Sequence, residues 1–281
     1  MKYEIYFKRY LDLIESTLGK LLPAQNQYPT EIHEAMRYSV FPGGKRFRPV
    51  LLLAACEAVG GKAEDALIPA ASIELIHCYS LVHDDLPCMD NDEFRRGKLT
   101  CHKKFGEAIA LLAGDGLLTL AMQILSRVEP SKKGLQLLEE ISTASGTYGM
   151  IGGQVADMLA LKQELTMPLL DYISIHKTGK LIKASAACGA ISGGASKEAA
   201  QRMVRYGEAL GLAFQKIDDL LDGDGYTKFV KAKEIKQRVR DLIAITKKEI
   251  KPFGKKAEKL QVLSDFLLKR IPKAKNVAVD K

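Results

Sequence analysis

Several features that define other classes of protein are missing from this sequence of 281 residues. Tryptophan is absent. No run of 18 consecutive apolar residues occurs, which predicts a protein without a transmembrane segment. The five cysteines are scattered, with no Cys-x-x-Cys pair and no signal peptide ahead of them. A disulfide framework is therefore not expected, and the pattern predicts a soluble protein of the reducing cytoplasm.

No Ser/Gly-rich linker or low-complexity segment divides the chain, so we expect one domain spanning 1–281. Apolar residues make up 47% of the sequence, and Ala, Leu, Ile, Glu and Lys dominate, as is typical of an all-α protein. Periodicity and short connections predict helices at 3–22, 30–39, 49–59, 66–85, 105–128, 135–148, 154–161, 167–189, 197–221, 231–249 and 255–270.

The net charge of +8 is concentrated in the C-terminal segment 228–281, which carries 17 Lys and Arg against 6 Asp and Glu. Apolar residues in this segment keep helical spacing, which favours amphipathic helices with a lysine-rich solvated face. Weak attraction to anionic membranes or nucleic acid is the alternative. No interleaved aromatic residues support nucleic acid, and we expect no nucleic-acid partner.

Two clusters of aspartate, at 83–90 and 218–222, lie within otherwise apolar stretches. Carboxylates placed so closely repel one another unless a cation binds them. In a helix Asp218 and Asp222 share one face, with Asp219 beside them. Pro87 ends the helix that carries Asp84 and Asp85, and Asp90 returns from a short loop.

Magnesium is the cation that these clusters favour. It takes one or two protein carboxylates and completes its octahedron with water and phosphate oxygens, so two acidic walls suggest a polyphosphate between them. The alternative is a pair of solvated helix ends.

Basic residues that could bind the remaining phosphate charge occur in three places. Gly-Gly-Lys-Arg-Phe-Arg-Pro at 43–49 can direct Lys45 and Arg48 toward an anion near a helix N-terminus. Arg95 and Arg96 can grip phosphate, or they balance the acidic residues before them. The third is His-Lys-Thr-Gly-Lys at 176–180, where a glycine within a helix indicates a kink or a close approach.

His77 lies two turns before Asp84 on the same predicted helix. A histidine on an apolar helix is more often a satisfied core residue, but this one is expected to point toward the same cavity. In the third basic region we expect Lys177 and Thr178 to be the phosphate ligands.

Taken together, these motifs resemble the trans-isoprenyl diphosphate synthases, in particular the bacterial and plastid-type farnesyl and geranylgeranyl diphosphate synthases. The resemblance runs from about residue 38 to residue 222. It rests on the motifs at 43–49, 77–90, 95–97, 113–115, 152–154, 177–179 and 214–222. It implies a helical bundle around a deep central cavity, a homodimer, and about three Mg²⁺ ions on the diphosphate of an allylic substrate.

The resemblance also assigns roles to individual residues. Asp84, Asp90 and Asp218 would be the principal metal ligands, assisted by Asp85 and Asp222. The allylic diphosphate would contact Arg95, Lys177, Thr178 and Gln215. Isopentenyl diphosphate would contact Lys45, Arg48, His77 and Arg96. The residues with a direct part in catalysis would be Lys177, Arg95, Asp84 and Asp218.

Product length depends in similar enzymes on the residues four and five positions before the first aspartate, which here are Ser80 and Tyr79. A tyrosine at the pocket floor should stop chain growth early, which favours the C15 farnesyl product. The C20 geranylgeranyl product is the alternative, because neighbouring helices and a dimer partner also shape the floor.

One departure from the family lies after the second cluster. Members of the family generally have a long loop there, with Gly-Lys and a further Asp. In this chain only the short segment 223–228 separates the second cluster from the basic segment. Lys228 is a candidate for the missing lysine. The shortening puts closure of the site in doubt more than the type of reaction.

Four other interpretations fit the sequence less well than a synthase. An HD-type metal phosphohydrolase would use His83-Asp84 but needs more histidine ligands than the spacing offers, and a di-iron bundle needs a second Glu-x-x-His. A class I terpene cyclase would not need the second diphosphate site at 43–49. A non-catalytic regulatory subunit would usually lose acidic ligands that this chain keeps.

Overall fold

The computed structural model describes residues 3–41 and 43–272. Its contacts group the chain into two compact units, one of Met1–Leu53 and Lys62–Ser142 and the other of Ala54–Gly61 and Thr143–Lys281. The single domain 1–281 expected from the sequence stays a prediction. The end of the basic segment, 273–281, lies outside the described residues.

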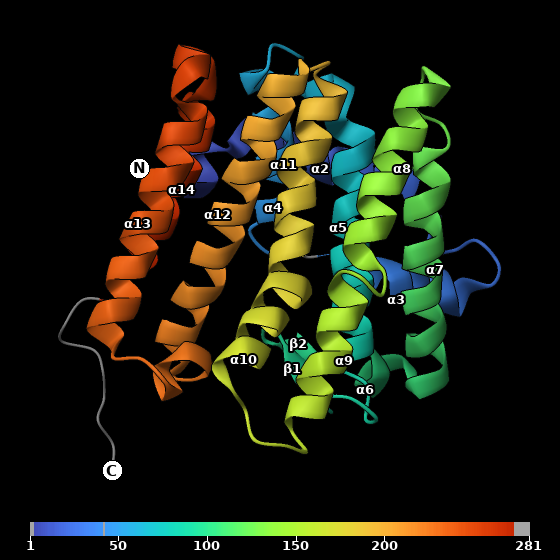
Figure 1. The fold of residues 1–281 in the computed structure, drawn as a ribbon. Helices are drawn as coiled ribbons and strands as arrows, with labels where there is room; N and C mark the ends of the chain where they lie inside the picture. Colours follow the sequence, from blue (N-terminus) through green and yellow to red (C-terminus); the bar gives the residue numbers. More distant parts are fainter. Residues whose placement is uncertain (1–2, 42, 273–281) are drawn as a thin grey trace. The chain divides into compact units, whose positions relative to one another are not determined.

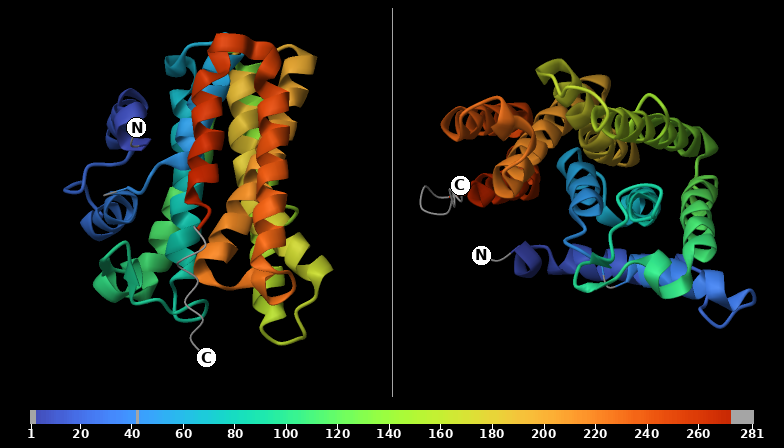
Figure 2. Two further views of the ribbon diagram at one scale, coloured as in Figure 1. Left: turned by 90° about the vertical axis from the view of Figure 1, so that its left-hand side faces the viewer. Right: turned by 90° about the horizontal axis from the view of Figure 1, so that it is seen from below.

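The first unit is built around one apolar helix. Its elements are α1 (Tyr3–Tyr6), α2 (Lys8–Leu21), α3 (Thr30–Val40), the short η1 (Ala63–Ala66), α5 (Leu67–Asp84), β1 (Phe94–Arg95), β2 (Lys98–Leu99), α6 (Cys101–Phe105) and α7 (Glu107–Leu125). Ile73, Leu75 and Ile76 of α5 are fully buried, although they point in different directions around the helix. In the right-hand view of Figure 2, α5 is seen end-on and α2 and α3 cross it. This packing explains why α5 is apolar on all sides.

The second unit is a layer of long helices. Its elements are α9 (Met150–Ala160), α10 (Met167–Ile173), η2 (Ser174–Gly179), α11 (Lys180–Ser192), α12 (Lys197–Asp222), η3 (Gly225–Lys228), α13 (Ala232–Ile250), η4 (Lys251–Ala257) and α14 (Glu258–Arg270). Figure 1 shows α12 between α11 and α13. Of the three boundaries between the units, one falls within α4 (Phe47–Ala58), one between Gly61 and Lys62, and one within α8 (Ser131–Ser145).

The ends of α12 follow its sequence. The Ser196 hydroxyl accepts a hydrogen bond from the backbone N–H of Ala199 and caps the N-terminus. Gly223 ends the helix with φ +70°, a conformation that glycine adopts without a steric penalty. The second aspartate cluster therefore occupies the last turn of a well-defined helix, as predicted.

The all-α fold class is confirmed, and two local features depart from the predicted helices. Residues 94–99 form a small antiparallel hairpin, with Phe94 opposite Leu99 and Arg95 opposite Lys98. The helix predicted at 167–189 contains a π-helical turn, Ser174–Gly179. This turn includes the glycine that indicated a kink in the sequence.

Within the described residues, Ala63–Asp84 and Glu107–Leu125 are long and apolar enough to cross a membrane. The core helix of a soluble protein passes the same test, and the first segment is 67% buried. The second segment, which is α7, is only 39% buried. Less than half of this segment is therefore buried within the described part of the chain.

Candidate active site

The first aspartate cluster is formed where α5 ends. The backbone N–H of Asp90 donates to the carbonyl of Asp84 at 2.9 Å, which closes the loop and brings Asp90 back toward the helix end. Asp85 is buried, and both of its carboxylate oxygens accept from Arg95 Nε, at 2.7 and 2.9 Å. Burial raises the pKa of Asp85, and the hydrogen bonds from Arg95 oppose this rise.

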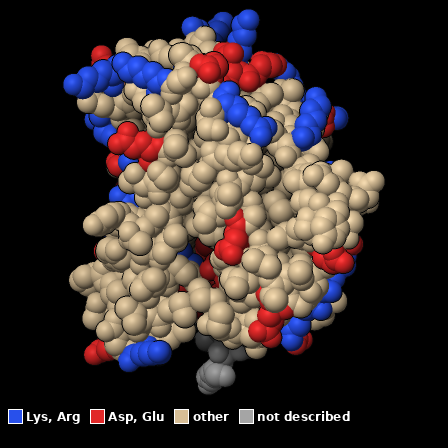
Figure 3. All heavy atoms as spheres, turned by 90° about the vertical axis from the view of Figure 1, so that its right-hand side faces the viewer, with Lys and Arg blue, Asp and Glu red and all other residues tan. Residues whose placement is uncertain are grey.

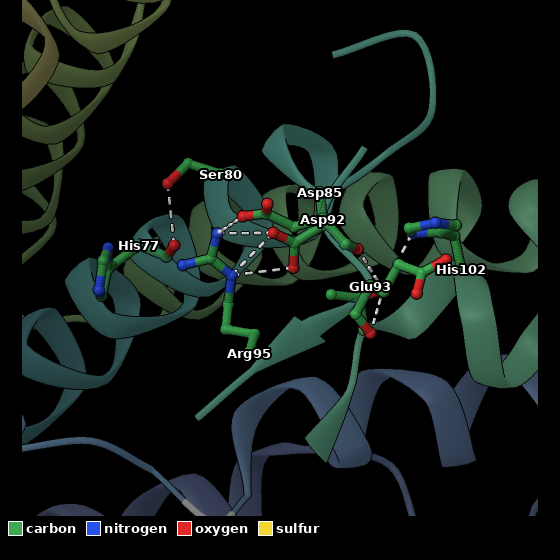
Figure 4. A network of polar contacts seen from close by, with 8 residues as sticks. His77, Ser80, Asp85, Asp92, Glu93, Arg95 and His102 are labelled. Atoms are coloured by element: carbon green, nitrogen blue, oxygen red, sulfur yellow. Dashed lines mark hydrogen bonds and ion pairs between the residues drawn. The ribbon is translucent and has the colours of Figure 1, made fainter. Parts of the chain in front are cut away.

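Arg95 is thus held by carboxylates. Figure 4 shows its guanidinium reaching Asp85 and Asp92, the latter at 3.3 Å. Asp85 is thus paired with this arginine, and the assignment of Asp84 and Asp90 as principal metal ligands, with Asp85 assisting, stays a prediction. The prediction that Arg95 contacts a diphosphate fits a guanidinium whose orientation is already set.

The hairpin sends the side chains of two adjacent arginines to different places. Arg96 and Gly97 form its turn with φ +54° and +76°, so the chain reverses between Arg95 and Lys98. While Arg95 reaches Asp85, the Arg96 guanidinium lies against the loop at 43–49, where a Cβ added to Gly44 would be 3.0 Å from Arg96 Nη2. Gly44 therefore leaves room for this arginine.

The predicted isopentenyl diphosphate ligands lie in the first unit. His77 is half-buried, and burial followed by the charges of Arg48 and Arg96 lowers its pKa well below the usual value. Because the charges of Arg48 and Arg96 act on His77, the three side chains lie in one electropositive region. Lys45 is exposed on the loop that contacts Arg96, beside this region. A neutral histidine among cations is suited to donating one hydrogen bond to an anion.

Arg46, within the same motif, was not assigned a role from the sequence. Its side chain is completely buried, with Nε 2.8 Å from Glu15 Oε1 and Nη1 2.8 Å from Glu74 Oε1. Its Nη2 donates to the carbonyl of Val40 at 2.8 Å, and its φ of +49° is unusual for a residue with a side chain. Arg46 therefore anchors the loop that presents Lys45. The sequence did offer one indication of a buried arginine: Glu74 is an acidic residue within an apolar helix, and such a residue needs a cation.

The second aspartate cluster lies in the second unit, at the end of α12. Asp218 Oδ1 accepts from Arg270 Nη2 at 2.7 Å. Asp219 is buried and accepts from Gln215 Nε2 at 2.8 Å and from the backbone N–H of Tyr226 at 2.9 Å. Burial raises the pKa of both carboxyls. Asp222 is exposed one turn beyond Asp218, on the same face of the helix.

The π-helical turn places Lys177 and Thr178 next to α9. A Cβ added to Gly153 would be 2.1 Å from the backbone nitrogen of Lys177, so only glycine allows the two backbones to approach this closely. Lys177 Nζ lies 2.6 Å from Asp157 Oδ2. Asp157 was missed in the sequence, although it follows the Gly-Gly-Gln motif at 152–154 by three residues and so lies on the same side of α9 as Gln154.

The histidines do not support a metal phosphohydrolase. His83 Nε2 is 3.0 Å from the carbonyl of Leu111, and a Cβ on Gly114 would be 2.0 Å from the same ring atom, so this ring packs against α7. His33, His102 and His176 bond to a backbone carbonyl or a threonine hydroxyl.

A magnesium ion fits the donor set of both clusters. Within 3–41 and 43–272, no group of three His, Cys, Asp or Glu side chains is gathered closely enough to hold a metal alone. Each cluster nevertheless offers the hard carboxylate oxygens that Mg²⁺ prefers, and this ion leaves most of its coordination to water and phosphate. A metal shared with a diphosphate is consistent with both observations.

Of the two residues expected to limit product length, Tyr79 is 4% exposed and its ring packs edge-on against His83. Among the described residues, its hydroxyl has no hydrogen-bond partner. The hydroxyl of Ser80 donates back to the carbonyl of His77, as Figure 4 shows.

Lys228, the candidate for the lysine of the shortened loop, pairs with Asp224 on the surface.

Comparisons with known proteins show what the whole chain is similar to. The sequence profile of the polyprenyl synthetase family matches residues 29–243. The farnesyl diphosphate synthase of Geobacillus stearothermophilus is 43% identical over 80% of this chain and 77% of its own length. The geranylgeranyl diphosphate synthase of Cyanophora paradoxa is 38% identical over 94% and 95%. The apo structure of an FPP/GFPP synthase from Zymomonas mobilis matches with a TM-score of 0.90 and 34% identity, over 94% of this chain and 98% of that one.

Proposed function

Because the chain belongs to the polyprenyl synthetase family and is a trans-prenyltransferase, we propose that it makes farnesyl diphosphate. In this proposal it condenses isopentenyl diphosphate with C5 and C10 allylic diphosphates in a Mg²⁺-dependent reaction and releases pyrophosphate. The alternative product is geranylgeranyl diphosphate, which the similarity to synthases of both kinds leaves open. We further propose that residues 1–281 act as one domain.

The observation that carries the proposal is the electropositive region of the first unit. Arg48, Arg96 and neutral His77 form a place for an anion, and the Arg95 that Asp85 fixes lies beside it. In this proposal the region binds the diphosphate of isopentenyl diphosphate, which gives the reaction two diphosphate substrates. A terpene cyclase would need only one.

The proposed chemistry separates into binding, departure and attack. Magnesium, when bound by Asp84, Asp90, Asp218 and Asp222, would neutralise charge on the departing pyrophosphate. Lys177 and Arg95 add fixed positive charge for the same oxygens, and Asp157 and Asp85 hold them in place. Lys45, Arg48 and His77 keep the second substrate oriented, so that its double bond attacks the allylic cation. The proton lost afterwards goes to pyrophosphate, as the family resemblance implies.

Incubation with isopentenyl diphosphate, Mg²⁺ and each of the C5, C10 and C15 allylic diphosphates, followed by sizing of the products, tests the proposal. We expect extension to C15 and inhibition by EDTA. Hydrolysis without extension would instead indicate a phosphohydrolase. Cyclic products formed without isopentenyl diphosphate would indicate a cyclase, and extension that survives EDTA would refute the metal assignment.

Replacing Tyr79 with alanine is expected to lengthen the major product by at least one isoprene unit. Removing a buried aromatic ring opens space where the growing chain would end. Chromatographic sizing of the dephosphorylated products measures this change. Tyr79→Phe is the matched control, and we expect it to keep the wild-type profile because the hydroxyl makes no hydrogen bond within the described residues. An unchanged profile in Tyr79→Ala would remove Tyr79 from the pocket floor.

We also propose that the protein is a homodimer that covers α7. On this helix Leu111 and Leu112 are 47% and 49% exposed. Figure 3 shows the side of the molecule on which α7 lies, and uncharged atoms cover much of it. Asp115 follows one turn later with its side chain 57% exposed. A carboxylate in the apolar face favours a second copy of the chain over the hydrocarbon of a membrane.

The double substitution Leu111→Glu/Leu112→Glu is expected to convert the dimer to a monomer, because it places charge in an apolar interface. Sedimentation velocity at micromolar concentration measures the outcome. Ile5→Glu, which changes a 66% exposed side chain on α1, is the control and should leave the mass unchanged. A wild-type protein that sediments as a monomer would contradict the proposal.

A further inference from the structure

The last residue of α14 contacts the second aspartate cluster directly. Arg270 Nη2 lies 2.7 Å from Asp218 Oδ1, and the guanidinium stands 5.3 Å from the ring centre of Phe214, one turn earlier on α12. The side chains of Arg270 and Asp218 are only 23% and 30% exposed. This pair is therefore more protected from solvent than an ordinary surface ion pair.

Buried hydrogen bonds fix α14 against its neighbours. The hydroxyl of Tyr206 on α12 donates to the carbonyl of Leu260 at 2.8 Å and lies 3.2 Å from the hydroxyl of Ser264. The hydroxyl of Thr246 on α13 lies 3.0 Å from that of Ser264. These contacts set the register of α14, so Arg270 is delivered to one place on α12.

Asp218 pairs with Arg270 and not with a lysine of the shortened loop. Lys228, the only basic residue between Asp222 and Val230 in the sequence, pairs with Asp224 at the surface. The cation that pairs with Asp218 therefore comes from α14 and not from the loop that follows Asp222. A divalent ion that binds Asp218 Oδ1 has to displace a guanidinium from that atom and also meets its repulsion.

We propose that Arg270 is a built-in counter-ion of Asp218 that competes with the metal. It keeps the second aspartate cluster neutralised before substrate binds and weakens metal binding to Asp218. It acts as a positioning residue and has no contact with the reacting atoms. The inference rests on the proposed function, because that function makes Asp218 a metal ligand.

Binding of Mn²⁺ to the full-length, metal-free protein without substrate tests this competition. Free Mn²⁺ is measured by electron paramagnetic resonance during a titration. Arg270→Gln is expected to tighten binding at this cluster by about 3- to 10-fold, as expected for the loss of a partly buried ion pair. Arg270→Lys keeps the charge and should remain close to wild type. Lys269→Gln removes the same charge from the exposed neighbouring residue and should have no effect.

A variant that lacks the Asp218 carboxylate shows whether Arg270 acts on Mn²⁺ binding by way of Asp218. In Asp218→Asn, the further change Arg270→Gln should no longer alter Mn²⁺ affinity. The proposal is overturned if Arg270→Gln binds Mn²⁺ as wild type does or more weakly. It is also overturned if Lys269→Gln tightens binding equally, or if the effect persists in Asp218→Asn. Circular dichroism of each variant identifies any that fail to fold, and Arg270→Met, which also removes the charge, replaces Arg270→Gln if that variant does not fold.

Failure of this inference differs from failure of the proposed function. An active prenyltransferase whose Mn²⁺ affinity ignores Arg270 would refute the competition alone. A protein that shows the competition but extends no allylic diphosphate would refute the function and leave the ion pair as a determinant of metal binding.

Discussion

Replacing Asp84 or Asp218 with asparagine is expected to lower kcat by about 10²- to 10³-fold. Asparagine keeps the size of the side chain but loses the negative charge that attracts a divalent ion. The departing pyrophosphate would then lack part of the charge that stabilises it. Steady-state kinetics with isopentenyl and geranyl diphosphates at saturating Mg²⁺ measure the loss.

Two other aspartates serve as controls for this prediction. Asp12→Asn changes a 63% exposed side chain paired with Lys8 and should leave kcat unchanged. Asp85→Asn should act through Arg95, which both Asp85 oxygens hold, and raise KM for the allylic substrate more than the Mg²⁺ requirement. If Asp84→Asn and Asp218→Asn kept more than about a tenth of the wild-type kcat, the ligand assignment would be wrong.

The kcat of the double variant Asp84→Asn/Asp218→Asn tests whether the two clusters act on one diphosphate. If they do, Asp84→Asn/Asp218→Asn should lose much less than the product of the two single losses, because the second change acts on a reaction already deprived of its metal. Independent, multiplicative losses would argue for two separate roles.

Replacing Arg46 with methionine is expected to lower the free energy of unfolding by about 3–5 kcal/mol. Methionine fills similar space but leaves the carboxylate of Glu74, whose side chain is 2% exposed, without its cation. The carbonyl of Val40 also loses its buried donor. Urea denaturation followed by circular dichroism measures the change. KM for isopentenyl diphosphate should rise as well, since Arg46 anchors the loop that carries Lys45.

A second arginine provides the comparison for Arg46→Met. Arg9 pairs with Glu64 at 2.8 Å, but the two side chains are 64% and 52% exposed. Arg9→Met should therefore cost about 0.2–1 kcal/mol. Equal losses in the two variants would show that burial of the Arg46 pairs adds nothing to stability. The double variant Arg46→Met/Glu74→Gln should recover part of the lost stability.

Sequence patterns predicted the helices well because most of them follow regular apolar spacing with clear ends. The second cluster is an example, since Asp218 and Asp222 lie on one face of α12 as expected, and Gly223 ends the helix. Pro87 likewise ended α5 near Asp84. The hairpin at 94–99 was missed because its strands have two residues each, too few to show a strand pattern.

The partners of the candidate ligands could not be predicted in the same way. Asp85 with Arg95, Lys177 with Asp157, and Asp218 with Arg270 are pairs of side chains from different elements. Composition and spacing show that a carboxylate needs a cation, but several lysines and arginines satisfy that need equally well on paper. The choice depends on tertiary packing, as the register of α14 shows for Arg270.

The hairpin turn of Arg96 and Gly97 restricts how this segment can evolve. Because only two residues reverse the chain, insertion or deletion of one would change the turn and the pairing of Arg95 with Lys98. Arg96, which lies in the turn, would then leave the space beside Gly44. Length variation among natural variants should therefore gather in other surface loops, and residues 94–99 should keep their number.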